Sequence, residues 1–501
     1  MNRFDVAILG GGIAGMASAA RLAAAGYSTV VIEAHGQIGG CAGYYRRRGF
    51  SFDVGATTLV DFGPDGVGGE LCRSLGLELR AEPLPGYVAH LPDRRITLHR
   101  DPAAWRRERL RLGEGPAHHA LWELLDRLAD AFWTASRRGV RLPLRGLGSL
   151  WRAARCTPIS AWALSRYLGW TLGDALRAHG LREARALVGL LSMLVEDTVH
   201  AKVDEAPLIN AALGITIRGA GLSRAPGGMQ GFWRQLGGAY LAKGGAIRRG
   251  CRALRVSGGL GAFIVETTRG PIAAAQVVST LPLSVSAALS PQLGEALEPY
   301  LLRDQAAQGG ALLLCLGVPE AEVAEEAFTH HQLLEDEEAP LGDGNNLFIS
   351  VSSPGDLESA PPGHRAVMIS THTALGPWQD LSEETYRTKK EVMEARLIRL
   401  ARRVYPALGR RSVVRELATP HSYARFAHRP LGAVGGSRLN PSNANQHAVP
   451  HDVGIPGVHL AGDGTWPGLG TVAGVVASRI IAEQVEARAE PRAQEQRDEV
   501  Q

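Results

Sequence analysis

A glycine-rich turn near the start of the chain has the spacing of a nucleotide-binding loop. Gly10, Gly12 and Gly15 follow the pattern GxGxxG. In such loops the first glycine makes the turn, the second lets the backbone approach a pyrophosphate and the third lets a helix pack on a strand. The amides of Ile13 and Ala14 lie where the turn enters the expected helix and are free to bind the anion. The spacing therefore predicts a dinucleotide site.

The elements around this turn are those that such a site needs. An apolar strand at 5–9 precedes it, a helix at 14–25 follows, and a second strand at 29–32 ends at Glu33. A strand-helix-strand unit of about 30 residues is the expected size. Glu33 is placed to accept hydrogen bonds from an adenosine ribose. The alternative, a glycine-rich turn beside a solvated glutamate, does not explain the whole pattern.

Composition favours a globular enzyme. The chain has 501 residues, 45% hydrophobic and 21% charged, with 61 glycines. This excludes overall disorder and allows two to four domains. A net charge of +4, from 54 basic and 50 acidic residues, gives no sign of a dedicated nucleic-acid binder. The five cysteines lie far apart without a CxxC pair, so we expect no disulfide framework, no metal site and a reducing, cytoplasmic location.

Changes in residue composition along the sequence divide the chain into segments. Helix-forming residues dominate 101–180, glycine-rich turns return near 227, and strand-like runs mark 300–424. We expect a discontinuous nucleotide-binding domain at 1–95, 225–290 and 425–485, a second domain at 96–224 and 291–424 with a helical insertion at about 101–180, and a disordered tail at 486–501. No export signal or membrane-spanning helix is expected, because the early apolar run is short and 271–294 is interrupted by prolines.

A second glycine pair points to a flavin. Gly39 and Gly40 follow Glu33 by six and seven residues, and Cys41 comes next. This arrangement resembles the extended signature of flavin-dependent desaturases and amine oxidases, in which the segment after the ribose-binding acid wraps FAD.

The C-terminal part of the chain carries a matching resemblance. Segment 457–464 is similar to the C-terminal flavin motif of that superfamily, and 226–229 with 244–248 is similar to the region that leads into the strand near the adenine. Asp463 would bind the ribityl-phosphate part of FAD, and the helix starting at Thr471 would point its N-terminus at the flavin. A turn aspartate is the alternative for Asp463. The resemblance implies cofactor contacts at Gly39, Gly40, Cys41, Ala253, Gly462, Asp463, Gly470, Thr471 and Val472.

Further motifs resemble one branch of this superfamily, the carotenoid desaturases and isomerases, which includes phytoene desaturase-like and carotenoid 3,4-desaturase-like enzymes. They are 50–57, 349–352, 371–373 with Trp378, and Arg425-Phe426 followed by Gly435-Gly436. The resemblance implies an α/β fold: a Rossmann-type FAD-binding domain of the two-dinucleotide-binding class, with an interleaved mixed-sheet substrate domain and a helical insertion.

The same resemblance implies an FAD-dependent oxidoreductase. Its substrate would be a carotenoid or related polyene isoprenoid, desaturated or isomerised by hydride exchange with flavin N5. Oxygen, a quinone or another acceptor would regenerate the cofactor. Desaturation, isomerisation and saturation differ in their electron balance. The residues of the sequence do not distinguish among these three reactions.

Two alternatives remain open. A flavin amine oxidase would need aromatic residues beside the flavin, and the segment 464–470 offers only Trp466, although Tyr423 is a candidate partner from elsewhere. A non-enzymatic prenyl-lipid carrier of the GDP-dissociation-inhibitor type shares the general fold. The intact glycine pattern, Glu33 and Asp463 argue against the carrier.

No residue is nominated as catalytic. Glu196, Asp197, His200 and Asp204 form a polar group in an apolar stretch and are candidates for proton transfer or cation stabilisation, with His372 a weaker one. A solvated helix end is the simpler interpretation.

Residues 131–172 contain seven arginines and no acidic residue. They are interleaved with Trp133, Trp151, Trp162, Tyr167 and Trp170. Arginine with tryptophan on helices favours a bilayer interface, so we expect peripheral binding to the inner face of a membrane. In the alternative, the tryptophans pack in the core and the arginines cover a solvated face. No nucleic-acid motif accompanies them.

Overall fold

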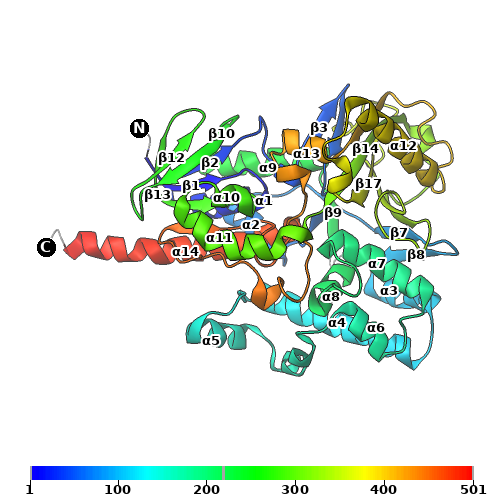
Figure 1. Cartoon of the computed structure of the whole chain (residues 1–501), viewed down its shortest axis with the longest axis horizontal. Coiled ribbons are helices and arrows are strands. Elements are labelled where there is room, and N and C mark those ends of the chain that lie inside the picture. The colour runs from blue at the N-terminus through cyan, green and yellow to red at the C-terminus, as the bar shows by residue number, and fades with distance from the viewer. Residues whose placement is uncertain (1–2, 217–220, 499–501) are drawn as a thin grey trace.

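The N-terminal strand-helix-strand unit forms the centre of a seven-stranded sheet. The structure is a computed structural model that describes residues 3–216 and 221–498 (Figure 1). The strand order is β10-β2-β1-β13-β12-β11, and β19 pairs with β13. Only β12 and β11 run antiparallel to their neighbours in this sheet. The strands are β1 (Arg3–Leu9), β2 (Thr29–Glu33), β10 (Ala246–Arg249), β11 (Ala253–Ser257), β12 (Phe263–Thr267), β13 (Ile272–Ser279) and β19 (Val458–Leu460).

Helices cover both faces of this sheet, which explains its continuous apolar strands. Val6 and Ile8 of β1 belong to the same buried cluster as α1 (Ile13–Ala24) and α14 (Thr471–Asp498). Because side chains alternate along a strand, Ala7 and Leu9 face the other way, into a cluster with α11. The helices on that second side are α10 (Leu283–Ala287) and α11 (Pro291–Asp304).

A second seven-stranded sheet has the order β18-β14-β17-β16-β15-β7-β8. It is antiparallel except for the parallel pair β15 and β7. Its strands are β7 (Gly86–His90), β8 (Arg95–His99), β14 (Gly310–Pro319), β15 (His330–Leu334), β16 (Asn346–Val351), β17 (His364–Thr373) and β18 (Val414–Ala418). Helix α12 (Glu383–Ala401) buries Leu397 and Leu400 against it.

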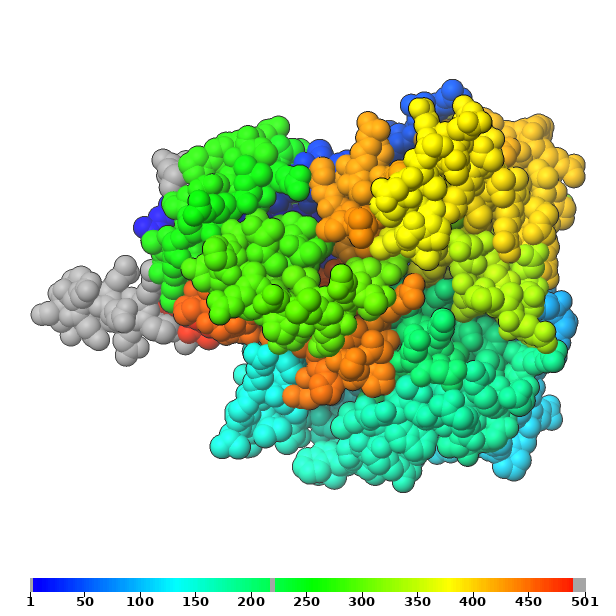
Figure 2. All heavy atoms as spheres, in the orientation of Figure 1, coloured from blue at the N-terminus to red at the C-terminus, as the bar shows by residue number. Residues whose placement is uncertain are grey.

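A layer of helices lies beside both sheets, in the lower half of Figure 1. It consists of α3 (Pro102–Glu108), α4 (Pro116–Arg137), α5 (Gly146–Cys156), α6 (Leu172–Ala178), α7 (Arg185–Val199) and α8 (Leu208–Thr216). The space-filling view shows part of the orange C-terminal segment between this layer and the green part of the chain (Figure 2).

Shorter elements join these units. They are β3 (Tyr44–Arg47), β4 (Phe50–Asp53), β5 (Leu59–Val60), α2 (Val67–Leu75), β6 (Glu82–Pro83), β9 (Leu222–Arg224), α9 (Met229–Ala242) and α13 (Pro420–Phe426). β3 pairs with β4, and β9 lies between β5 and β6.

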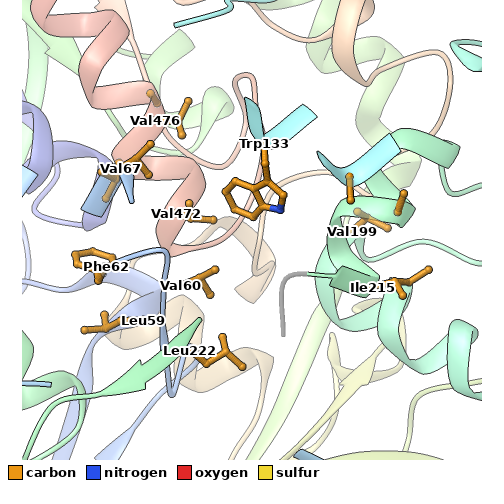
Figure 3. Packing of buried hydrophobic residues seen from close by; sticks show 14 of the residues in the cluster. Leu59, Val60, Phe62, Val67, Trp133, Val199, Ile215, Leu222, Val472 and Val476 are labelled. Atoms are coloured by element: carbon orange, nitrogen blue, oxygen red, sulfur yellow. The ribbon is translucent and has the colours of Figure 1, made fainter. Parts of the chain in front are cut away.

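A continuous apolar core connects the first sheet with the helical layer. Figure 3 shows Val472 and Val476 of α14 beside Val67, with Trp133 of α4 further across and Val199 of α7 beyond it; all belong to one buried cluster. The C-terminal helix and the inserted helices therefore share a core, and the predicted fold class is confirmed.

Three predicted boundaries differ from the structure. Strand β7 was expected in the first domain, but it is fully buried in the second sheet beside β15. Helix α11 was expected in the second domain, but Leu293 and Leu297 pack with the first sheet. The tail was expected to be disordered from 486, but helix α14 continues to Asp498. The last three residues, 499–501, lie outside the described part of the chain.

Candidate active site

A cavity of about 1200 Å³ lies between the two sheets and takes its walls from both. Typical ligand sites occupy roughly 300–1,000 Å³, so this space can hold more than one small ligand. All residues predicted to contact the cofactor line it except Gly15 and Val472: Gly10, Gly12, Ile13, Ala14, Glu33, Gly39, Gly40, Cys41, Ala253, Gly462, Asp463, Gly470 and Thr471.

The fold itself does not require a glycine at position 12. Gly12 is the N-cap of α1, with φ −76° and ψ −176°, a conformation open to any residue. Among the described residues, a Cβ on Gly12 would come within 4 Å of only the Cα of Gly40, at 3.9 Å. The first turn of α1 holds no acidic side chain, so its amides and dipole face the cavity uncompensated. These features suit the close approach of an anion to the backbone.

The two predicted residues outside the cavity wall have packing roles. A Cβ on Gly15 would lie 2.0 Å from the carbonyl oxygen of Gly10, so Gly15 allows α1 to pack on the preceding turn. The side chain of Val472 lies in the core cluster.

Backbone donors fix the carboxylate of Glu33 at the cavity wall. Its Oε2 accepts from the amide of Gly11 and its Oε1 from the amide of His35, each at 2.7 Å. Each carboxylate oxygen has a second lone pair, which leaves acceptor capacity for ligand hydroxyls.

The second glycine pair folds back on the first loop. The amide of Gly39 donates to the carbonyl of Gly11 at 2.8 Å. Gly39 and Gly40 have φ of +134° and +55°, which favour glycine. The turn delivers Cys41 to the cavity, where burial raises the pKa of its thiol and keeps it neutral.

Asp463 forms an ion pair that the sequence analysis missed. Its Oδ2 lies 2.8 Å from Nη2 of Arg429, whose side chain is 11% exposed. Burial lowers the pKa of Arg429, but the carboxylate of Asp463 more than offsets it, so the pKa lies above its usual value. A carboxylate at a buried strand end needs a cation nearby. This requirement could have prompted a search for a basic partner of Asp463 in the sequence.

Most of the predicted polar group does come together. Asp197, His200 and His372 line the cavity, and Glu196 lies behind them with its Oε2 3.6 Å from Nδ1 of His372. Asp204 does not belong to the group: it is exposed and pairs with two arginines on the surface, Arg177 and Arg182. It lies in the surface segment between α7 and α8, four residues past His200.

The aromatic candidates for an amine site are separated. Trp466 is buried among core residues, beside Phe132, and does not line the cavity. Tyr423 does line it, and its hydroxyl donates to the carbonyl of Val54 at 2.9 Å.

The arginine-rich and tryptophan-rich region divides into a buried and an exposed part. Trp133 is in the core. Trp151 and Trp162 are 63% and 56% exposed, close in sequence to four exposed aliphatic residues: Leu147, Leu150, Ile159 and Leu168. Within residues 3–216 and 221–498, no helix has the length and apolar character needed to cross a membrane.

Three of the seven arginines in this region pair with acidic side chains from elsewhere in the protein. Arg137 lies 2.5 Å from the buried carboxylate of Asp61, and Arg141 and Arg152 both pair with Glu483 of α14. Six of the seven arginines are nonetheless exposed, so the surface of this region is both basic and apolar.

The fold and the cavity define a two-sheet α/β protein with a large ligand site between its sheets, and comparison with known proteins gives the family. The model for flavin-containing amine oxidoreductases matches residues 13–482. The chain belongs to this family.

The curated relatives that the chain resembles include an isomerase and a desaturase. The chain is 24% identical over 512 aligned residues to the chloroplastic prolycopene isomerase of Daucus carota, covering 97% of this chain and 80% of that protein. It is 21% identical to the 4,4'-diapophytoene desaturase of Staphylococcus aureus strain COL, covering 96% and 98%. Among solved structures, cyclohexylamine oxidase from Brevibacterium oxydans has a TM-score of 0.60 at 18% identity, covering 96% and 99%, which supports the fold.

Proposed function

We propose that the chain binds FAD and desaturates or isomerises a carotenoid or a related polyene isoprenoid. The observation that carries the proposal is the large cavity, which is lined both by the glycine-rich loops, which suit a dinucleotide, and by apolar side chains of several other elements. The similarity to a prolycopene isomerase and a diapophytoene desaturase supports the substrate class.

The residues at the glycine-lined end fit FAD. A Cβ on Gly12 would enter space that the protein leaves free, as expected where a ligand approaches the backbone. The N-terminus of α1 would hold the pyrophosphate, Glu33 the adenosine ribose, and Asp463 with Arg429 the ribityl part.

The rest of the cavity would orient the substrate and exclude water. When bound, FAD supplies hydride acceptance at flavin N5. Apolar side chains from α7, β9, β14 and β16 would hold the polyene by burying its surface. They are Met193, Leu222, Leu313, Leu347 and Phe348. Oxygen, a quinone or another acceptor would restore the oxidised cofactor.

Expression in a host that makes acyclic carotenoids tests the proposal. We expect the wild-type chain to change the absorbance or isomer composition of the pigment. Asp463→Ala should abolish the change, because it removes a polar group from the cofactor end and leaves the buried Arg429 without its partner. Asp452→Ala is the control, since Asp452 pairs with Arg488 outside the cavity. Unchanged pigments in several hosts, with rapid turnover of a primary or secondary amine by the purified protein, would instead establish an amine oxidase.

We also propose that the chain binds a membrane surface peripherally, through the exposed apolar residues of α5 and the segment Ile159–Tyr167. An enzyme whose substrate is dissolved in lipid needs a surface that binds the membrane. Figure 1 shows α5 at the outer edge of the helical layer. Tryptophan suits headgroup depth, and nearby arginines would meet anionic lipid.

Removing the two exposed indoles should weaken vesicle binding. Burying a large apolar side chain contributes roughly 1.5–3 kcal/mol, so Trp151→Ala with Trp162→Ala should lower affinity for anionic liposomes at least about tenfold. Flotation measures the bound fraction. Leu357→Ala is a matched control, because Leu357 is 66% exposed in the loop between β16 and β17. Equal flotation of the double variant and the wild type would overturn this part of the proposal.

A further inference from the structure

Glu196, His200 and His372 form a series of contacts on the cavity wall. The rings of His200 and His372 are 4.7 Å apart at an interplanar angle of 65°. On the other side of His372, its Nδ1 lies 3.6 Å from Oε2 of Glu196. Two elements distant in sequence, the C-terminus of α7 and the end of β17, thus bring a carboxylate and two imidazoles together.

The carboxylate in this series is held in place from behind. Oε2 of Glu196 accepts from Nδ2 of Asn346 at 2.5 Å. Oδ1 of Asn346 accepts from the amide of Gly342 at 2.7 Å, which fixes the orientation of the Asn346 amide. A base whose orientation is set by a third group is the usual arrangement for proton transfer in enzymes.

The two imidazoles differ in their surroundings. Burial lowers the pKa of His372, but Glu196 more than offsets it with help from Asp197, against the opposing charge of Arg438, so the pKa is raised. For His200, burial, His372 and two arginines, Arg429 and Arg438, all lower the pKa. His372 is therefore the imidazole that takes up a proton, and His200 stays neutral beside it.

The series also reaches the cofactor end of the cavity. A Cβ on Gly435 would lie 2.0 Å from Cε1 of His200, so this ring packs directly on the backbone there. The amide of Gly435 in turn donates to the thiol of Cys41, one of the predicted flavin contacts. The side chain of His372 is 27% exposed and lines the cavity.

We propose that His372 is the proton acceptor of the reaction and that Glu196 positions it through Nδ1. The inference rests on the function proposed above. In desaturation, bound FAD would supply acceptance of a hydride from one allylic carbon, and His372 would take a proton from the neighbouring carbon at Nε2. The electron pair of the second C–H bond becomes the new double bond, and the proton passes on to solvent.

Turnover measurements test the catalytic part. General base catalysis contributes about 10²–10⁴-fold, so His372→Gln should lower kcat by that factor with unchanged flavin content. A base must be unprotonated, so the rate falls as pH drops through its pKa. Glu196→Gln lowers the pKa of His372 and should move this acid limb to lower pH. His364→Gln, on the same strand but outside the cavity, should change neither. Wild-type rates and an unshifted pH profile in both site variants would overturn the inference while the proposed function stood.

A titration without substrate separates the two proposals. Proton-carbon NMR of histidine Cε1 in the flavin-loaded protein, with His372 assigned by its loss in His372→Gln, gives the pKa directly. We expect Glu196→Gln to lower it. An unchanged pKa would overturn the pairing of Glu196 with His372, whether or not a carotenoid is the substrate. A lowered pKa in a protein that converts no carotenoid would support the pairing and contradict the proposed substrate.

Discussion

A Gly12→Val protein is expected to fold normally and to be purified without flavin. Valine can adopt the extended conformation of Gly12, and the protein leaves room for its Cβ. The added methyl groups would occupy the space in which the backbone meets the pyrophosphate. The loss should be nearly complete, because the clash is with the ligand itself. Visible flavin absorbance per protein, with circular dichroism for the fold, measures both parts.

Two comparisons make the Gly12 result specific. Gly238→Ala on the exposed side of α9 should retain flavin, since a Cβ there meets nothing within 4 Å among the described residues. Gly15→Val should instead disrupt folding, because its Cβ overlaps the carbonyl oxygen of Gly10. A folded Gly12→Val protein with full yellow flavin would contradict the site assignment. A wild-type protein that cannot be loaded with FAD would favour the prenyl-lipid carrier.

The first nucleotide-binding unit could be predicted from the sequence because its determinants are local. The glycine spacing, the apolar strand before it and the acid at the next strand end all fall between Arg3 and Glu33. Each choice of residue there agrees with the same strand-turn-helix geometry, and the structure places Gly12 and Glu33 on one cavity wall.

Pairings between distant segments could not be predicted in the same way. Strand β7 joins the second sheet by pairing with β15, and nothing local distinguishes it from a strand of the first sheet. The ion pair of Arg429 with Asp463 and the contact of Glu196 with His372 likewise depend on which segments the fold brings together.

A count of charges along the sequence overstates the net charge of a region whose arginines have long-range partners. The run of arginines without acids between 131 and 172 indicated a basic surface. Asp61 and Glu483, far away in sequence, neutralise part of it. A local count of charges cannot include such partners, whereas the exposed tryptophans of the same region keep their significance.

A buried ion pair supports the cavity wall near the predicted flavin. Arg224 donates through Nη1 to Oδ2 of Asp53 and to the carbonyl of Thr57, the latter at 2.8 Å. Oδ1 of Asp53 accepts from the amide of Met229, the first residue of α9, at 2.7 Å. Both charged side chains are at most 3% exposed. The pair thus ties β4, β9 and α9 together beside Thr57, which lines the cavity.

Arg224→Met should destabilise the protein by about 3–5 kcal/mol, because it leaves the carboxylate of Asp53 buried without its cation. Replacing both partners, as Asp53→Asn with Arg224→Met, should recover part of the loss, since no unpaired charge remains and asparagine Oδ1 can still accept from Met229. Arg234→Met on the neighbouring helix α9 is the control: its pair with Glu358 is exposed and should contribute about 0–1 kcal/mol. Urea unfolding of the flavin-loaded proteins measures all three differences. If Arg224→Met cost no more than Arg234→Met, the buried pair would not be a support of the cavity wall.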